Sequence, residues 1–299
     1  MQLREHRMKA CNSRTVIITG SGGGLGRAYA LALAAEGANV VVNDIRADAA
    51  AAVVDEILTQ GGQAIANSDD ITRMDTATNI VDAALEAFGE VHVLINNAGV
   101  LADRMFISLS EADWDKVMQV HLKGHFCLAN ILGRRWRDLA KAGQPVDARI
   151  INTSSGAGLQ GSIGQSNYSA AKGGIASLTL VQAAELGRYG VTVNALAPAA
   201  RTSMTQSAMP DVVKKPEDGS FDLWAPENVA PLVVWLSSSE SKHISGQILE
   251  SQGGRISLCD GWRTGLTVDH GKRWEISEVG YAVDQLIGKA PAAQKVWGS

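Results

Sequence analysis

Short runs of β-branched residues alternate along this chain with Ala-rich segments whose apolar residues recur at helical spacing. The pattern predicts strands at 15–19, 39–43, 91–95, 149–153 and 191–196, and helices at 26–36, 47–60, 73–88, 111–140, 168–189 and 226–237. Strands that alternate with helices are typical of a parallel sheet covered on both faces. Right-handed crossovers then give an α/β fold with a Rossmann-like, doubly wound parallel sheet in a single domain.

The length and hydrophobic content favour one large core. The chain has 299 residues, of which 45% are hydrophobic, enough to bury one sizeable α/β core. We therefore divide it into a leader at 1–14, a Rossmann-like domain at 15–262 and a C-terminal extension at 263–299. The leader carries basic residues but lacks the apolar region of a secretory signal. No apolar stretch is long enough to predict a membrane span.

Charge and cysteine content exclude several classes of function. The formal charge is −4, with 27 Lys and Arg against 31 Asp and Glu and no long run of either sign. This balance predicts neither a nucleic-acid partner nor an anionic membrane surface. Cys11, Cys127 and Cys259 are odd in number, far apart and without metal-ligand spacing. We expect reduced thiols, a cytoplasmic protein and no metal site.

A glycine-rich segment follows the first predicted strand and opens the first predicted helix. Its candidate cofactor-binding residues are Gly20, Gly22, Gly24, Leu25 and Gly26. Glycines let backbone N–H groups approach a pyrophosphate, and the start of the helix adds partial positive charge. A merely flexible turn is the alternative, but so many glycines would cost conformational entropy without a return. The segment predicts a dinucleotide site.

Asp44 ends the second predicted strand, about twenty residues beyond the glycine segment. A carboxylate at this position can accept hydrogen bonds from the adenosine ribose of NAD, whereas it would repel the 2′-phosphate of NADP. Arg46 argues the other way, because it could pair with that phosphate. We predict NAD, with NADP as the less favoured cofactor and a solvated strand-end carboxylate as the non-functional alternative.

Two further strand ends carry candidate cofactor contacts. Asp70 and Ile71 lie at the end of the third strand region, where a carboxylate and an apolar side chain could flank adenine; a solvated turn is the alternative. Asn97, Ala98 and Gly99 follow the next predicted strand. Their small side chains and amides could let the chain pass beneath the cofactor, although a simple Asn-rich turn would look similar.

Tyr168 and Lys172 stand four residues apart on a predicted helix and so share one face. A phenol has an ordinary pKa near 10, so a nearby ammonium is the usual physical route to activating it as a base. Spacing alone is weak evidence, since many exposed pairs share it. Ser155 ends the strand before this helix and supplies a hydroxyl on the same side.

These motifs, in this order, resemble those of the short-chain dehydrogenases/reductases over about residues 14–262. The resemblance implies that Ser155, rather than its neighbour Ser154, polarises the substrate oxygen. It implies Tyr168 as the acid/base, and Lys172 as the group that anchors the ribose and activates the phenol. By analogy alone, the segments 111–140 and 168–189 would assemble a homodimer or homotetramer.

A closer likeness is to the (3R)-hydroxyacyl-CoA dehydrogenase part of peroxisomal multifunctional β-oxidation enzymes and to bacterial, partly sterol-degrading relatives. The stretches that carry this likeness are 22–30, 41–44, 113–115, 120–124, 164–168 and 230–233. It implies an NAD-linked secondary-alcohol dehydrogenase whose small-molecule substrate is an acyl-CoA or a steroid. An NADPH-dependent reductase of 3-oxoacyl carriers and a non-catalytic dinucleotide-binding regulator are the alternatives.

The chain departs from the family pattern at two places. His121 replaces the usual asparagine, so it is either part of the proton relay or a satisfied core histidine. Ala199 replaces the glycine after Pro198, on the side where the resemblance places the nicotinamide. We expect Pro198, Arg201 and Ser203 to contribute to that side of the cofactor site.

Two long segments could shape the substrate site. The connection at 204–224 follows the strand that ends near 196, and lids often occupy this edge of such a sheet; an ordered surface loop is the alternative. The extension beyond 262 carries Trp274, Tyr281 and Trp297, too much apolar surface for a disordered tail. It could cover a neighbouring subunit, roof the substrate cleft or pack over its own sheet.

Overall fold

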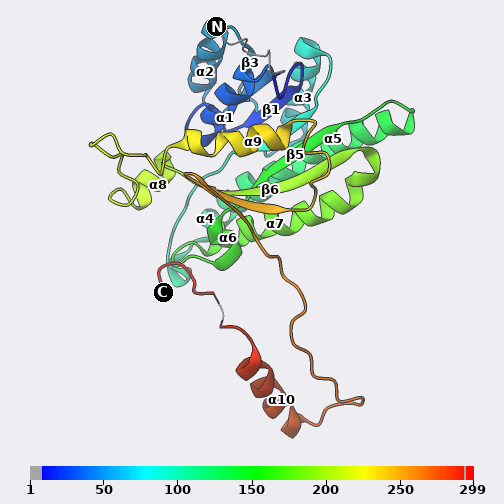
Figure 1. Cartoon of the computed structure of the whole chain (residues 1–299), viewed down its shortest axis with the longest axis vertical. Coiled ribbons are helices and arrows are strands. Elements are labelled where there is room, and N and C mark those ends of the chain that lie inside the picture. Colours follow the sequence, from blue (N-terminus) through cyan, green and yellow to red (C-terminus); the bar gives the residue numbers. More distant parts are fainter. Residues whose placement is uncertain (1–8, 293) are drawn as a thin grey trace, which may run out of the picture.

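The computed structural model describes residues 9–292 and 294–299, so most of the predicted leader lies outside the described residues. One sheet runs through the molecule in the order β3-β2-β1-β4-β5-β6-β7-β8 (Figure 1). Its strands are β1 Thr15–Thr19, β2 Asn39–Asn43, β3 Gln63–Asn67, β4 Val93–Asn96, β5 Ala148–Thr153, β6 Val191–Ala199, β7 Ile248–Gln252 and β8 Arg255–Leu258. All neighbouring strands pair in parallel except β8, which runs antiparallel to β7.

Helices cover both faces of this sheet (Figure 1). The longer ones are α1 Gly24–Ala35, α2 Ala47–Thr59, α3 Met74–Phe88, α4 Glu111–Met118, α5 Gly124–Lys141, α7 Ser166–Leu186, α9 Ala230–Ser237 and α10 Ile276–Lys289. The shorter turns are η1 Phe106–Ser108, η2 Gln119–Lys123, α6 Gly156–Gln160, η3 Gly187–Tyr189, α8 Ser203–Ala208 and η4 Pro226–Asn228. One core forms beneath α1, α2 and α9, and a second beneath α3, α5 and α7.

Alternating side chains of the inner strands feed the two cores. Val16 and Ile18 of β1 belong to the core under α1, whereas Ile17 between them belongs to the core under α3 and α5. A strand buried on both faces needs this continuous apolar run. The predicted Rossmann-like, doubly wound fold is confirmed, and the bounds of its first strands agree closely with the prediction.

The predicted helix at 111–140 is interrupted. It forms α4, then the π-helical segment η2, then α5. Short π-helical segments insert one extra residue into a turn and often mark functional positions. In η2 the extra residue turns His121 inward, where its ring is buried and hydrogen-bonded to the backbone of Val100. Apolar residues continue at helical spacing across η2, so the sequence pattern alone predicts one uninterrupted helix.

Strands β2 and β3 lie on one side of β1, whereas β4 and the strands after it lie on the other side. At such a switch point the connections leave toward opposite faces, and a crevice opens beyond the carboxyl ends of the strands. The predicted glycine segment follows β1, and the segment that begins at Asn97 follows β4. The topology therefore brings both to the same crevice.

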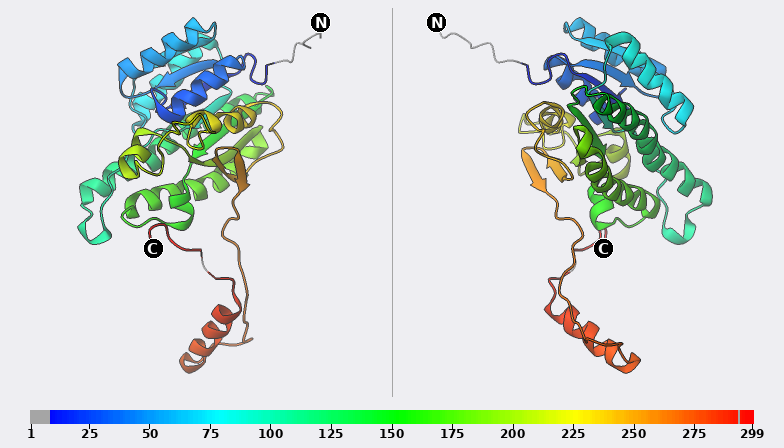
Figure 2. Two further views of the ribbon diagram at one scale, coloured as in Figure 1. Left: turned by 60° about the vertical axis from the view of Figure 1, so that its left-hand side comes forward. Right: turned by 90° about the vertical axis from the view of Figure 1, so that its right-hand side faces the viewer.

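The C-terminal extension leaves the body of the domain after β8. Helix α10 stands away from the rest of the molecule in every view (Figures 1 and 2), and none of its residues is buried. Among the described residues of 260–295, no hydrogen bond or ion pair reaches the body. The chain then returns, and Trp297 pairs with Ser162 in a short parallel bridge. The described residues of the extension do not pack over its own sheet (Figure 1).

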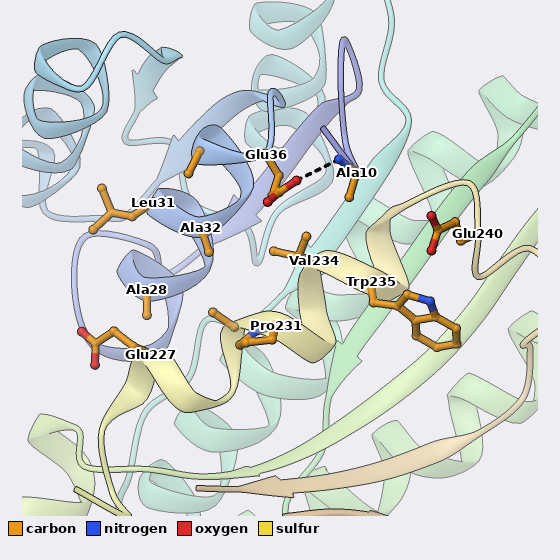
Figure 3. Close-up of a pocket in the computed structure, with 12 residues that line it drawn as sticks. Ala10, Ala28, Leu31, Ala32, Glu36, Glu227, Pro231, Val234, Trp235 and Glu240 are labelled. Atoms are coloured by element: carbon orange, nitrogen blue, oxygen red, sulfur yellow. Dashed lines mark hydrogen bonds between the residues drawn. The ribbon is translucent and has the colours of Figure 1, made fainter. Parts of the chain in front are cut away.

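An apolar hollow of about 540 Å³ lies between α1 and α9 (Figure 3). Its walls include Leu31, Pro231, Val234 and Trp235, with Glu36 bonded to the backbone of Ala10 at its rim. None of the predicted site residues lines this hollow. We therefore treat it as a gap between packed helices, separate from the crevice.

The described part of the chain offers neither a membrane-spanning helix nor a metal cluster. Across residues 9–292 and 294–299 we find no helix with the length and apolar character that crossing a bilayer requires. The same residues bring no three His, Cys, Asp or Glu side chains together as a metal site would. The three cysteines are free thiols, and Cys11 and Cys127 are buried.

Candidate active site

The glycine segment lies flat against the end of β4. Gly20 has a φ of +62°, and a Cβ built on it would lie 2.7 Å from the Cα of Ala98. A Cβ on Gly26 would collide with the carbonyl oxygen of Gly20. Side chains are thus excluded at both positions, and the backbone of the segment remains accessible as a cradle.

Helix α1 begins directly on this cradle, at Gly24. No side chain caps its first turn in the described part of the chain, and Gly23 occupies the N-cap position. The first N–H groups of a helix have no partner within the helix and favour an anion. Leu25 packs against the core beside α1 and fixes the helix in place. This uncapped helix start fits the pyrophosphate of a dinucleotide.

Asp44 lies at the carboxyl end of β2 and is buried beside the cradle. Its Oδ2 accepts a hydrogen bond from Gly22 N at 3.0 Å, and its Oδ1 accepts one from Arg46 N at 3.1 Å. Arg46 Nε is 3.3 Å from the same Oδ1, although this side chain is 64% exposed. The carboxylate is therefore held in position, whereas the guanidinium paired with it is mostly exposed.

Asn97 and Ala98 tie the end of β4 to the end of β1. Both backbone N–H groups donate to Thr19 Oγ1, at 2.9 and 3.0 Å. Asn97 Nδ2 also donates to the carbonyl oxygens of Thr19 and Gly20, at 2.9 and 3.1 Å. Gly99 lies against the ring of His121 and leaves no room for a Cβ. The predicted small residues thus form a cross-linked floor of the crevice.

Asp70 and Ile71 have their side chains engaged by the protein itself. The Asp70 carboxylate accepts hydrogen bonds from Thr72 N at 2.8 Å and from Thr72 Oγ1 at 3.0 Å. Ile71 is buried, and its Cδ1 would be 2.7 Å from a Cβ on Gly124. Their predicted contact with adenine rests on their place just beyond β3, since both side chains have other partners.

Ser155, Tyr168 and Lys172 come together beyond the carboxyl end of β5. Ser155 caps α6, and its Oγ accepts a hydrogen bond from Ala157 N at 3.2 Å. Tyr168 lies in the first turn of α7. Lys172, one turn later, places its Nζ 5.6 Å from the centre of the Tyr168 ring. The lysine is buried and donates to the carbonyl oxygen of Thr153 at 2.5 Å.

The neighbouring serine has a different task. Ser154 is buried, and its Oγ donates to the backbone oxygen of Lys172 at 2.9 Å. This bond fastens α7 to the end of β5. The Ser154 hydroxyl is therefore engaged by the backbone of α7, and Ser155 is the serine beside the Tyr168 phenol.

Burial dominates the electrostatics of this cluster. It raises the pKa of Tyr168; a hydrogen bond with the Ser155 side chain opposes the rise, and the charge of Asp103 adds to it. Burial also lowers the pKa of Lys172 to about 7. The sequence led us to expect that Lys172 would depress the tyrosine pKa. In the protein alone the pKa of Tyr168 is instead raised, because burial disfavours the charged phenolate.

His121 completes the cluster from the opposite side. Its ring meets the Tyr168 ring edge to face, with centroids 5.2 Å apart. Its Nε2 lies 2.8 Å from the oxygen and 3.0 Å from the nitrogen of Val100. Burial, followed by the charge of Lys172, lowers the pKa of His121 to about 3, against the effect of the Val100 bond. The imidazole is neutral at physiological pH.

Pro198, Arg201 and Ser203 follow one another from the end of β6 to the start of α8. Pro198 pairs within the sheet, opposite Ser251 of β7. The Arg201 guanidinium pairs with Asp222 and donates to the oxygen of Val213 at 2.9 Å. It thus holds the long connection at 204–224. Ser203 is the first residue of α8.

Sequence analysis missed three residues near the cluster. Thr202 caps α8, and its Cγ2 would be 3.4 Å from a Cβ on Gly24, so it borders the cradle. Asp103 accepts a hydrogen bond from Gln165 Nε2 at 2.8 Å and faces the phenol electrostatically. His125 is fully buried one turn beyond His121. None of the three belongs to a motif that the sequence analysis used. Each is a polar residue inside a predicted helix or loop, which alone does not indicate a site.

A family model described as short chain dehydrogenase matches residues 14–212. The chain belongs to the short-chain dehydrogenases. A crystal structure of such a dehydrogenase from Mycobacterium avium is 51% identical, with a TM-score of 0.89, and covers 97% of this chain and 100% of its own. The predicted family is thereby confirmed, as is oxidoreductase chemistry at CH–OH groups with a nicotinamide cofactor.

Two curated relatives are also similar to this short-chain dehydrogenase. The hydroxyacyl-CoA dehydrogenase ChsB1 of Mycobacterium tuberculosis is 43% identical over 257 residues, 83% of this chain and 80% of the relative. The peroxisomal multifunctional enzyme type 2 of Mus musculus is 38% identical over 273 residues, 88% of this chain. The match spans 33% of the length of that mouse enzyme.

Proposed function

We propose that this protein is an NAD-dependent dehydrogenase that interconverts a 3-hydroxyacyl-CoA and the corresponding 3-oxoacyl-CoA. The observation that carries the chemistry is the cluster in which Tyr168 lies beside Ser155, Lys172 and His121 at the switch-point crevice. The observation that favours NAD is the buried, backbone-held carboxylate of Asp44. The hydroxyacyl-CoA dehydrogenase relative supports the acyl-CoA substrate.

The residues of the chain divide between binding and proton transfer. The cradle from Gly20 to Gly26 and the start of α1 would hold the pyrophosphate, and Asp44 would accept hydrogen bonds from the ribose. When bound, the dinucleotide supplies the acceptor for the hydride. Ser155 Oγ would hold the substrate oxygen in both directions, so that the oxygen keeps its place as the carbon changes its geometry.

Tyr168 would take the hydroxyl proton at its phenol oxygen during oxidation and return it during reduction. Its pKa is raised by burial in the protein alone, so deprotonation needs a positive charge nearby. The Lys172 ammonium supplies one when the lysine is protonated, and its pKa of about 7 lets it gain or lose a proton near neutral pH. A group with a pKa near the working pH is the most efficient proton carrier.

Hydroxysteroids form the second proposed substrate class. A solved 7 alpha-hydroxysteroid dehydrogenase, in complex with NADH and a 7-oxo bile acid, is 30% identical to this chain, with a TM-score of 0.72. The match covers 83% of this chain and 96% of that structure. The same cluster could act on a secondary alcohol of either scaffold, so the walls of the cleft would decide between them.

An NADPH-dependent reductase of 3-oxoacyl carriers is the alternative function. The 3-oxoacyl-[acyl-carrier-protein] reductase FabG of Staphylococcus epidermidis is 35% identical over 247 residues, 81% of this chain. Arg46 favours a 2′-phosphate, because its guanidinium could pair with it. The buried carboxylate of Asp44 opposes it, because a phosphate there would meet like charge.

We also propose a cytoplasmic homodimer or homotetramer. The outer faces of α5 and α7 carry exposed Phe126, Leu180 and Val181, which a second copy could cover. Reduced cysteines fit a cytoplasmic compartment. Size-exclusion chromatography with light scattering would measure the assembly directly.

The test of the proposed function is Tyr168→Phe. We expect turnover of 3-hydroxyacyl-CoA with NAD to fall at least about 1,000-fold, because the phenol is the proton acceptor. NADH affinity, measured by fluorescence titration, should change by less than about threefold, since the cradle and Asp44 are untouched. Turnover retained in this variant would remove Tyr168 from the reaction and with it the proposed mechanism.

A further inference from the structure

The C-terminal end of the chain lies against the loop that joins Ser155 to Tyr168. Trp297 N donates to the oxygen of Gly161 at 3.2 Å, and Ile163 N donates to the oxygen of Trp297 at 3.0 Å. These two bonds form the parallel bridge between Ser162 and Trp297. Figures 1 and 2 show the chain end beside the body while α10 stands away.

The indole of Trp297 reaches the residue next to Ser155. A Cβ built on Gly156 would lie 2.5 Å from Trp297 Cη2 and 2.7 Å from Cζ2, so the ring tip rests directly on the glycine. Gly156 is the first residue of α6, which Ser155 caps. The indole of Trp297 therefore contacts the residue that follows Ser155, the serine proposed to hold the substrate oxygen.

The other edge of the same loop is also fixed. Arg104 N donates to the oxygen of Gly164 at 2.9 Å, and Asn167 Nδ2 donates to the oxygen of Ala102 at 3.0 Å. The loop at 161–165 thus has the segment after β4 on one side and the C-terminal end on the other. Both neighbours border the approach to Tyr168.

The surface that results is apolar and incompletely covered. Trp297 is 45% exposed, and beside it Ile163 and Val296 are 49% and 41% exposed. Apolar surface next to a reacting group is stabilised when an apolar part of a substrate covers it. The remaining indole surface therefore fits the acyl chain or ring system of a substrate, whereas a pyrophosphate or adenosine would gain little from it.

We propose that Trp297 is a specificity-determining residue, which walls the substrate cleft beside Ser155 and contacts the apolar part of the substrate. This role rests on the proposed function, which supplies the reaction. It adds a residue that selects among substrates by the length of their acyl chain. The body of the domain supplies the chemistry, and the last residues of the extension supply part of the selection.

Two 3-hydroxyacyl-CoA substrates that differ only in chain length test this role. We expect Trp297→Ala to lower kcat/KM for 3-hydroxyhexadecanoyl-CoA about tenfold or more, as loss of an apolar pocket contact does. The value for 3-hydroxybutyryl-CoA, which is too short to cover the indole, should change less than about twofold. Trp297→Phe, which keeps an aromatic ring, should recover part of the loss.

Trp262→Ala is the matched control, since this indole lies beyond β8, just before the extension, and is fully exposed. It should leave both kcat/KM values within twofold of the unchanged protein. An equal loss for both substrates in Trp297→Ala would assign the residue to support of α6 and overturn the proposal. The proposal would also fail if neither value changed, or if Trp262→Ala gave the same long-chain defect.

A binding measurement separates this proposal from the proposed function. In the Tyr168→Phe background with NADH bound, calorimetry gives the affinity for 3-oxohexadecanoyl-CoA without turnover. Adding Trp297→Ala should weaken that affinity about tenfold. If the unchanged protein turned over no acyl-CoA or steroid, the proposed function would fail; if it turned over both chain lengths and Trp297→Ala altered neither kinetics nor affinity, only the role of Trp297 would fail.

Discussion

Two regions of the molecule form the proposed site in opposite ways. One is the set of strand ends at β1, β4 and β5, and the other is the C-terminal extension. At the strand ends, Asn97 and Ala98 make three short hydrogen bonds with Thr19 and one with Gly20, and Ser154 fastens α7 to the sheet. The extension makes none with the body between 260 and 295 among its described residues, and contacts it again only near Trp297.

This difference separates what must be rigid from what can vary. Proton transfer requires donor and acceptor positions held within a fraction of an ångström, and a cross-linked framework provides this. Selection of a substrate requires only a surface of suitable shape, which a loosely tethered segment can provide. Changes in the framework should therefore have large effects on every substrate, whereas changes in the extension should be small or selective.

Gly20→Ala should have the largest effect. Its Cβ would lie 2.7 Å from Ala98 Cα while the residue holds a φ of +62°. We expect loss of about 2 to 3 kcal/mol in the free energy of unfolding and at least a 100-fold loss of NADH affinity. Gly61→Ala is the control: its φ is +79°, but nothing lies within 4 Å, so it should cost about 1 kcal/mol and leave NADH affinity unchanged. Equal effects of the two variants would contradict a tightly fitted cradle.

Replacing the carboxylate at the end of β2 should have the next largest effect. Asp44→Ala removes a buried negative charge that would repel a 2′-phosphate, so the NADH to NADPH affinity ratio should fall about 10- to 100-fold. Arg46→Ala should move the ratio in the opposite direction by a smaller factor. Fluorescence titration of both cofactors measures the ratios. An unchanged ratio in Asp44→Ala would exclude the carboxylate as the selecting group.

Acid should destabilise the framework through its buried histidines. Burial lowers the pKa of His121 to about 3 and that of His125 far below its ordinary value. Above pH 6.5 neither state is protonated; below it the unfolded chain takes up protons that the folded one refuses. Stability is lost as the pH falls from 6.5 toward 3, at up to about 1.4 kcal/mol per pH unit for each histidine.

Urea unfolding between pH 5 and pH 8 measures this slope. His121→Asn should reduce this slope, and His243→Asn, at an exposed position, serves as the control. A variant with the same slope as the unchanged protein would show that His121 is not buried in its neutral form.

Changes in α10 should have the smallest effect. Tyr281→Ser and Val283→Ser alter exposed side chains of a helix that buries none of its residues. We expect less than about 0.5 kcal/mol of change in the free energy of unfolding of a monomeric sample and no change in NADH affinity. A loss of several kcal/mol would show that α10 is packed against the body or a second copy.

Much of the framework was predictable because its sequence signals are local. The strands β1, β2 and β4 have apolar centres, the glycine segment follows the first strand, and Tyr168 and Lys172 are one helical turn apart. These signals gave the fold, the family and the cluster at the carboxyl end of β5. The number of strands was underestimated, because β3, β7 and β8 are only partly buried and lack a continuous apolar run.

The remaining features depend on tertiary contacts that no local pattern encodes. The inward turn of His121 requires the π-helical segment, and the engagement of Arg201 requires Asp222 across a long connection. Burial reverses the expected shift of the Tyr168 pKa, and burial is a property of the assembled site. The path of the extension was left open between three arrangements for the same reason.

The short parallel bridge at Trp297 has a practical consequence for anyone preparing this protein. A long tether keeps the final residues at a high local concentration near their docking loop, so they can detach and rebind without leaving the molecule. Residues fused after Ser299 would be carried to the entrance of the cleft. A purification tag placed there would compete with long acyl chains for this surface. The measured preference for chain length would then depend on the tag.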